Sequence, residues 1–131
     1  MAVNTQYDIV KIETDLFNEL DKISTITNLF VGSRPESSDG MDDFIVVKVN
    51  TQMTDKLAYG QCITSIQLFV RNYTGGIRNS ARISALFQAI IAVLPIELIK
   101  YRFHYSTNSN IVQDGLGFST QIINLLTFIK R

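Results

Sequence analysis

The chain has 131 residues, of which 46% are hydrophobic and 18% are charged, a balance typical of a folded globular domain rather than a disordered segment. Twelve basic and twelve acidic residues give a formal net charge of zero, which argues against general electrostatic binding to nucleic acid or anionic lipid. The single cysteine excludes an internal disulfide and a thiolate-rich metal site. We expect one domain, spanning residues 1–131.

The first expected element is an amphipathic helix. Apolar residues recur at steps of three and four between Tyr7 and Ile23, with polar residues between them, and Asn4 or Thr5 is the expected cap. The chain start lacks a basic region followed by an apolar core, and no apolar run approaches the roughly 18 residues that span a bilayer. We therefore expect a soluble protein made in the cytoplasm, without membrane contact.

Three strands and one loop are expected next. A short strand over 29–31 precedes residues 32–42, whose Gly, Ser, Pro and Asp content predicts an exposed loop. A second strand is expected over 43–50 and a third over 61–73, where apolar and polar side chains alternate. The residues of the third strand predicted to face the core are Cys62, Thr64, Ile66, Leu68 and Val70.

A second helix and two strands complete the chain. An apolar stripe over 83–94 predicts the helix, which Pro95 ends, and alternating segments over 99–105 and about 117–129 predict the strands. The element order is thus α-β-β-β-α-β-β. This order predicts an α+β fold with a mainly antiparallel sheet of four to five strands and both helices on one of its faces.

Residues that carry catalysis or bind metals are few. His104 is the single histidine, and no carboxylate or nucleophile lies at a recognisable spacing from it. Cys62 is expected on the core face of its strand. Acidic residues around Asp39 and Asp42 lack the spacing of a calcium-binding loop. The sequence therefore predicts no catalytic residues, no metal site and no cofactor.

The strongest positive signal is that two strands are apolar on both faces. The last strand has Ile122, Leu126 and Phe128 on one side and further large aliphatic residues on the other, and the second strand is similar. Too few helices are expected to cover both faces, so one set should face outward and form a subunit interface. This set is Val47, Ile123, Leu125 and Ile129. The alternative is that the N-terminal helix packs on the opposite face of the sheet and covers these side chains within the subunit.

The loop over 32–42 is the expected contact with a partner protein. Arg34 is suited to donate two hydrogen bonds to a carboxylate of the partner, and Asp42 and Asp43 are further contact candidates. We expect the loop to become ordered when the partner binds.

A basic row is expected on one face of the fourth strand. It consists of Lys100, Arg102 and His104. Such rows are usually solvated, and with zero net charge no sequence-specific nucleic-acid binding is expected. A surface that tolerates passing DNA is the alternative.

The order of elements resembles that of the small tail-completion or tail-terminator proteins of tailed bacteriophages. The resemblance covers nearly the whole chain and rests on the element order and on the segment 34–47, a proline-containing loop that leads into Asp43-Phe44-Ile45-Val46-Val47. It implies a virion structural protein that forms a ring at the head-proximal end of a phage tail, caps the tail tube and joins it to the head-tail connector. No catalytic residues accompany the family.

The resemblance also implies partners and a location. The chain would form a homo-oligomeric ring, a hexamer for a tail terminator or a dodecamer for a connector component, and would bind tail-tube and connector proteins. It would be assembled in the host cytoplasm and reside in the neck of the virion, where DNA passes through the ring lumen.

Two other classes of protein fit the same pattern. A small-ligand-binding or enzymatic α+β domain would need a polar cluster in an apolar pocket, for which the sequence offers only His104, Cys62 and tyrosines. A bacterial assembly or adaptor subunit would show the same elements as a phage ring protein.

Overall fold

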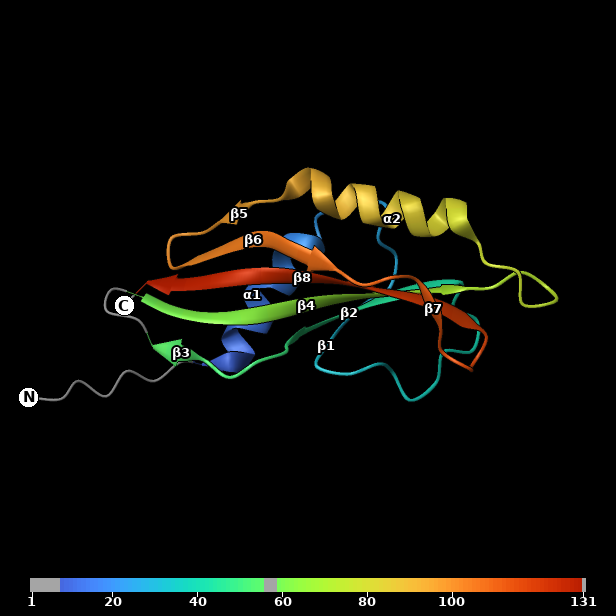
Figure 1. The fold of residues 1–131 in the computed structure, drawn as a ribbon, viewed down its shortest axis with the longest axis horizontal. Coiled ribbons are helices and arrows are strands. Elements are labelled where there is room, and N and C mark those ends of the chain that lie inside the picture. The colour runs from blue at the N-terminus through green and yellow to red at the C-terminus, as the bar shows by residue number, and fades with distance from the viewer. Residues whose placement is uncertain (1–7, 56–58, 131) are drawn as a thin grey trace, which may run out of the picture.

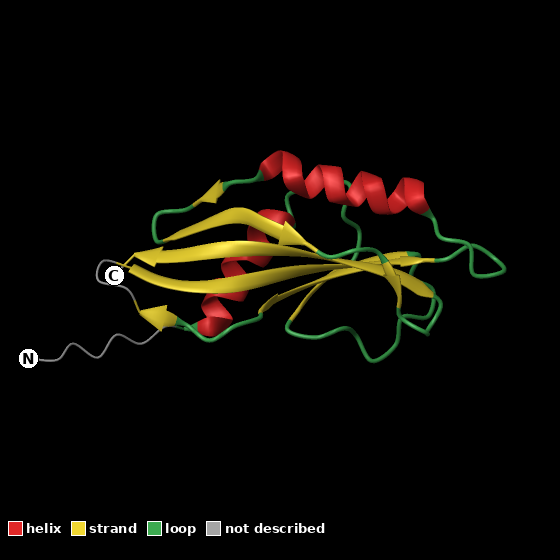
Figure 2. Cartoon of the chain, viewed as in Figure 1, coloured by secondary structure: helices red, strands yellow, loops and turns green. Residues whose placement is uncertain are grey.

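The computed structural model describes residues 8–55 and 59–130, and it shows an α+β fold in which two helices pack against one curled sheet (Figures 1 and 2). The helices are α1 (Ile9–Leu20) and α2 (Ser80–Val93). The strands are β1 (Leu29–Val31), β2 (Asp43–Val49), β3 (Thr54–Asp55), β4 (Tyr59–Arg71), β5 (Ile96–Glu97), β6 (Tyr101–Asn108), β7 (Val112–Gln113) and β8 (Phe118–Lys130).

The sheet is larger than predicted, and it is mixed. Six strands follow the order β1-β2-β4-β8-β6-β5, while β3 pairs with β4 and β7 pairs with β8. The β1–β2 pair is parallel and the others are antiparallel. The prediction of four to five mainly antiparallel strands is therefore wrong in size, because β3, β5 and β7 have two residues each and are too short to show a period. The predicted order of the longer elements is confirmed.

Both helices begin at a capping side chain. Asp8 and Asn79 each accept a hydrogen bond from the backbone N–H three residues further on. The caps predicted for α1, Asn4 and Thr5, lie outside the described residues. Pro95 follows the end of α2 as predicted. Neither helix in the described part of the chain is long and apolar enough to cross a membrane.

The main core lies between one face of the sheet and the two helices, as the sequence predicted. In Figure 1, α1 crosses behind the sheet and α2 runs along its β6 side. Each helix contributes three buried residues, which are Ile12, Leu16 and Leu20 from α1 and Ile83, Leu86 and Ile90 from α2. All five residues of β4 that were predicted to face the core are buried.

A smaller aromatic cluster lies on the opposite face of the sheet. Its buried members are Phe44, Val46, Phe69 and Phe118. Phe44 and Phe69 stack with ring centroids 4.5 Å apart, and Phe118 meets Phe44 edge-on at 5.2 Å. Neither α1 nor α2 covers this cluster, and Phe30 and Met41 pack against it.

Candidate functional site

The four side chains predicted to form a subunit interface lie inside the subunit. Val47, Ile123 and Leu125 are fully buried and Ile129 is 2% exposed, and all four belong to the core beneath the helices. The prediction that they face outward is therefore wrong. The alternation of a strand shows that both faces are apolar, but it does not show which face the helices cover. These side chains are covered within the subunit, but by two helices on one side of the sheet and not by an N-terminal helix on the opposite face.

The apolar side chains that face away from the helices belong to the alternate residues of β8 and β4. Ile122, Leu126 and Phe128 of β8 are half-buried, and Ile63 of β4 lies opposite Leu126 in the strand register. Tyr59 is 36% exposed and its ring meets that of Phe128 at 5.4 Å. We call these five residues the open face. They give one side of the sheet a partly exposed apolar surface, a feature common at protein interaction sites.

Arg34 of the loop over 32–42 contacts its own subunit. Its guanidinium lies 5.3, 4.9 and 5.7 Å from the ring centroids of Phe44, Phe69 and Phe118, and its Nη1 atom is 2.9 Å from a carboxylate oxygen of Asp114. The aromatic rings attract the cation, and the carboxylate completes its pairing. The expected carboxylate of a partner protein is thus replaced by Asp114 of the same chain, and Arg34 covers the aromatic cluster.

The environment of Asp114 favours its ionised form. Burial alone would raise the pKa of this carboxyl. Hydrogen bonds from the backbone N–H groups of Leu116 and Phe118, together with the hydrogen bond and charge of Arg34, outweigh burial, so the pKa of Asp114 is lowered. Asp114 therefore fixes both the Arg34 side chain and the turn before β8.

A second arginine, Arg71, anchors the same loop. Arg71 donates hydrogen bonds to the backbone carbonyls of Ser38 and Met41, both at 3.0 Å, and its guanidinium lies 4.6 Å from the Phe118 ring centroid. The side chains of Glu36 and Asp39, near the loop tip, are exposed. The loop is thus anchored at its base by two arginines, while its tip stays accessible.

The two acidic contact candidates differ in their surroundings. Asp43 is 6% exposed and accepts hydrogen bonds from Arg82 at 2.7 and 3.3 Å and from Thr27 at 3.3 Å. It links β2 to the first turn of α2, so the prediction of Asp43 as a partner contact is wrong. Asp42 is exposed and stays a candidate. Both carboxylates border a polar cavity of about 520 Å³, whose Arg71 and Arg82 already bind acceptors of this chain.

His104 and Cys62 lie on opposite faces of the sheet. The His104 ring meets the open-face residue Phe128 at 5.8 Å, whereas Cys62 is buried on the helix side. Burial raises the pKa of the Cys62 thiol, and hydrogen bonds with Thr64 and Thr127 only partly oppose this rise. Cys62 is therefore held as an unreactive thiol. Within residues 8–55 and 59–130, no three His, Cys, Asp or Glu side chains are grouped to hold a metal ion.

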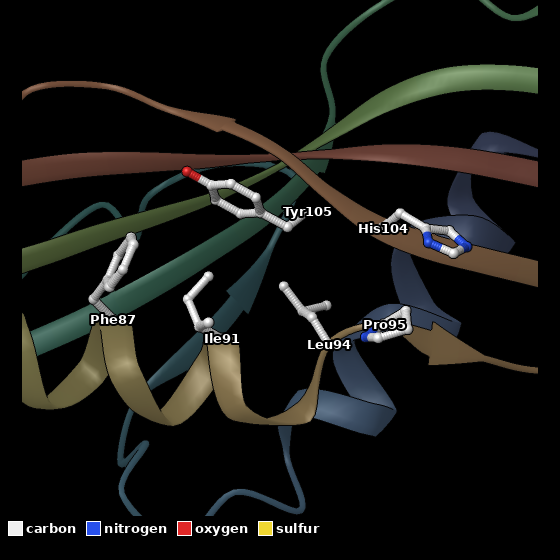
Figure 3. A pocket seen from close by; sticks show the side chains of 6 residues that line it. All are labelled: Phe87, Ile91, Leu94, Pro95, His104 and Tyr105. Carbon is white, nitrogen blue, oxygen red and sulfur yellow. The ribbon is translucent and has the colours of Figure 1, made fainter.

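A third surface feature is an apolar groove between α2 and β6, which we call the α2–β6 groove (Figure 3). It has a volume of about 380 Å³. Phe87 and Ile91 point into it from α2, Leu94 from the residue that follows α2, and Tyr105 faces them from β6. Its lining residues are Phe87, Ile91, Leu94, Pro95, His104 and Tyr105. The sequence placed the first three of these in the core stripe of the helix. The signal that it missed is the width of that stripe, of which only part is fully buried.

No protein-family model matches this chain, and no curated protein matches it. The open face, the anchored loop and the α2–β6 groove are therefore the observations from which a function is argued.

Proposed function

We propose that this chain is a virion structural protein that forms a ring at the head-proximal end of a phage tail. In this role it caps the tail tube, joins it to the head-tail connector, and resides in the neck of the virion after assembly in the host cytoplasm. The ring is a hexamer if the chain is a tail terminator and a dodecamer if it is a connector component. The proposal includes no catalytic activity and no cofactor.

The open face is the observation that carries this proposal. Both helices lie on one side of the sheet, so Ile63, Leu126 and Phe128 remain partly exposed on the other. A surface of this kind favours burial against another protein, because covering apolar area removes it from water. We assign the open face to the contact with tail-tube or connector proteins.

The loop over 32–42 supports a second contact with the same partners. Arg34 and Arg71 fix its base, so its tip is presented in a defined position at little cost in conformational entropy. Asp39, near the tip, and Asp42, at the junction of the loop with β2, are exposed and can pair with basic groups of a neighbouring protein.

The test is whether the chain completes tails. A phage in which the gene for this chain is disrupted should yield separate heads and tails, and the supplied wild-type protein should restore joined particles. Electron micrographs of purified tail tubes mixed with the protein should show a ring at one end of each tube. Normal joining in the absence of the protein, or tubes that stay bare at every protein concentration, would contradict the proposal.

A small-ligand function is the second candidate, because the volume of the α2–β6 groove lies within the usual range of about 300–1,000 Å³ for ligand sites. Few polar groups converge on it: His104 borders it, and the hydroxyl of Tyr105 already donates to the side chain of Asn108. Mass spectrometry of the purified protein under native conditions separates the two functions. A bound small molecule at one copy per chain would favour the ligand site over the ring.

A further inference from the structure

The outer edge of β6 is unpaired over most of its length. Within the described residues, β5 pairs only with Arg102 and Phe103, so no strand pairs with the outer side of β6 from His104 to Asn108, and a register shift against β8 interrupts the regular alternation between Tyr105 and Thr107. Strand edges of this kind present free N–H and C=O groups that accept another strand. This edge is therefore suited to an extended backbone rather than to a helix or a small molecule.

The hydrogen-bond alternation identifies the free groups. Lys130 N–H donates to the Lys100 carbonyl at 2.9 Å, on the β8 side, whereas Leu98 N–H donates to the Tyr101 carbonyl at 2.8 Å, on the outer side. Successive residues of a strand alternate between the two sides. The backbone groups of Tyr105 therefore point to the outer edge, directly beside the α2–β6 groove.

The opposite end of the sheet offers a matching edge. Asn28 accepts from Ile45 N–H at 2.9 Å and Gly32 donates to the Val47 carbonyl at 2.8 Å, so the backbone groups of Leu29 and Val31 in β1 point away from β2. The Val31 side chain is 38% exposed. It pairs in register with buried Val47, which places it on the helix side of the sheet, the side on which the groove residue Tyr105 also lies.

We propose that β1 of one copy of this chain pairs with the outer edge of β6 in the next copy. The sheet then continues from subunit to subunit with the helices on one side, and Val31 enters the neighbour's groove beside Ile91. This is strand addition, in which backbone hydrogen bonds hold the segment and a groove selects its side chains. The inference rests on the proposed ring and names the contact that closes it.

The difference between the two edges favours a ring over a dimer. A strand of three residues buries far less than the roughly 1,000 Å² expected of a stable interface, so one such contact alone is weak. Because the two edges differ, each copy contacts one neighbour through β1 and the other through β6. A row of subunits joined in this way has no unpaired edge only when it closes into a ring. Closure gives every subunit two contacts instead of one.

The experiment compares the native mass of the wild-type protein with that of Ile91→Lys, in the groove, and Val31→Lys, on the opposite edge. Each substitution is expected to convert the ring to the 14.8 kDa subunit. Gln88→Lys, at an exposed position of α2 outside the groove lining, is the matched control and should keep the wild-type mass. Circular dichroism checks that each variant is folded. Val31 is the more exposed of the two sites, so its variant keeps the test valid if Ile91→Lys unfolds.

A crosslink tests the pairing directly. Val31→Cys and Ile91→Cys proteins, mixed and oxidised, should form a disulfide-linked pair of two chains, whereas either protein alone should not. If the wild type is a ring and both lysine variants remain rings, the edge contact is wrong and the ring proposal stands. A discrete dimer that only Ile91→Lys dissociates would place β6 against β6 and overturn the role of β1. A wild type that stays at the subunit mass with and without tail tubes would overturn both proposals.

Discussion

The two faces of the sheet have similar sequences and opposite environments. On β8, Leu125 lies beneath the helices and is fully buried, while its neighbour Leu126 lies on the open face and is half-buried. The helix side holds a continuous aliphatic core, whereas the described part of the chain covers the other side at one end, where Arg34 lies over the aromatic cluster.

The difference shows how one strand can serve stability with one face and interaction with the other. Burial beneath two helices makes a side chain costly to change, because its removal leaves a cavity. A half-buried side chain on the open face contributes less to the subunit and remains available to a partner. The contrast is therefore measurable in pairs of equivalent substitutions.

The largest effect is expected from Leu125→Ala compared with Leu126→Ala. Replacing the buried Leu125 should lower the free energy of unfolding by about 2–5 kcal/mol. Replacing Leu126 should lower it by about 1 kcal/mol or less, since this side chain has less contact area to lose. Urea denaturation of both variants measures the difference. Equal losses would mean that the two faces are not distinct in the folded subunit.

Arg34→Ala removes the cover of the aromatic cluster. This variant loses the contacts with three aromatic rings and the pairing with Asp114, and it should be destabilised by about 1–2 kcal/mol. Limited proteolysis should cut the loop over 32–42 faster than in the wild type. Arg102→Ala, at an exposed position of β6, serves as the control and should change neither property. An unchanged cleavage rate in Arg34→Ala would show that Arg34 does not anchor the loop.

A smaller, pH-dependent effect is expected at Asp114. Its pKa is lowered in the folded protein from an ordinary value of 3.8, so its contribution is complete above that pH and is lost as the pH falls through the folded-state value. Asp114→Asn should therefore be less stable than the wild type at neutral pH, and the difference should shrink below about pH 3.8. Thermal unfolding from pH 7 to pH 2 measures it. A difference that grows on acidification would contradict the assigned pairing.

Leu126→Asp tests the open face as a partner surface, and its effect is expected on attachment to tail tubes more than on the fold. The subunit should stay folded, because its main core is untouched, but its attachment to tail tubes should be reduced at least tenfold. Thr14→Asp, at an exposed position of α1, is a matched control on the helix side. Cosedimentation with tubes gives the comparison. Full attachment of Leu126→Asp would remove the open face from the partner contact.

Long periodic segments made most of the fold predictable. The stripes of α1 and α2 and the alternation of β4 identified these elements and the buried face of β4 correctly. The two-residue strands β3, β5 and β7 could not be predicted, because so few residues carry no period. The choice of covered face on β8 also failed, because both rows are apolar and only the positions of the helices distinguish them.

The surroundings of Arg34 were not predictable for a different reason. Its partner Asp114 is 80 residues further along the chain, and the aromatic rings beneath it come from three separate strands. A loop rich in Gly, Ser and Asp indicates exposure, but a single arginine within it can find a partner only after the sheet has formed. The groove between α2 and β6 likewise depends on the spacing of two elements, which no local pattern contains.

The mass of the wild-type protein under native conditions tests the proposed ring most directly. Native mass spectrometry over a range of protein concentrations, with tail tubes added in parallel, should reveal a closed assembly of six or twelve copies of the 14.8 kDa chain and few smaller species. A single species at the subunit mass at every concentration, with no protein bound to the tubes, would contradict the account.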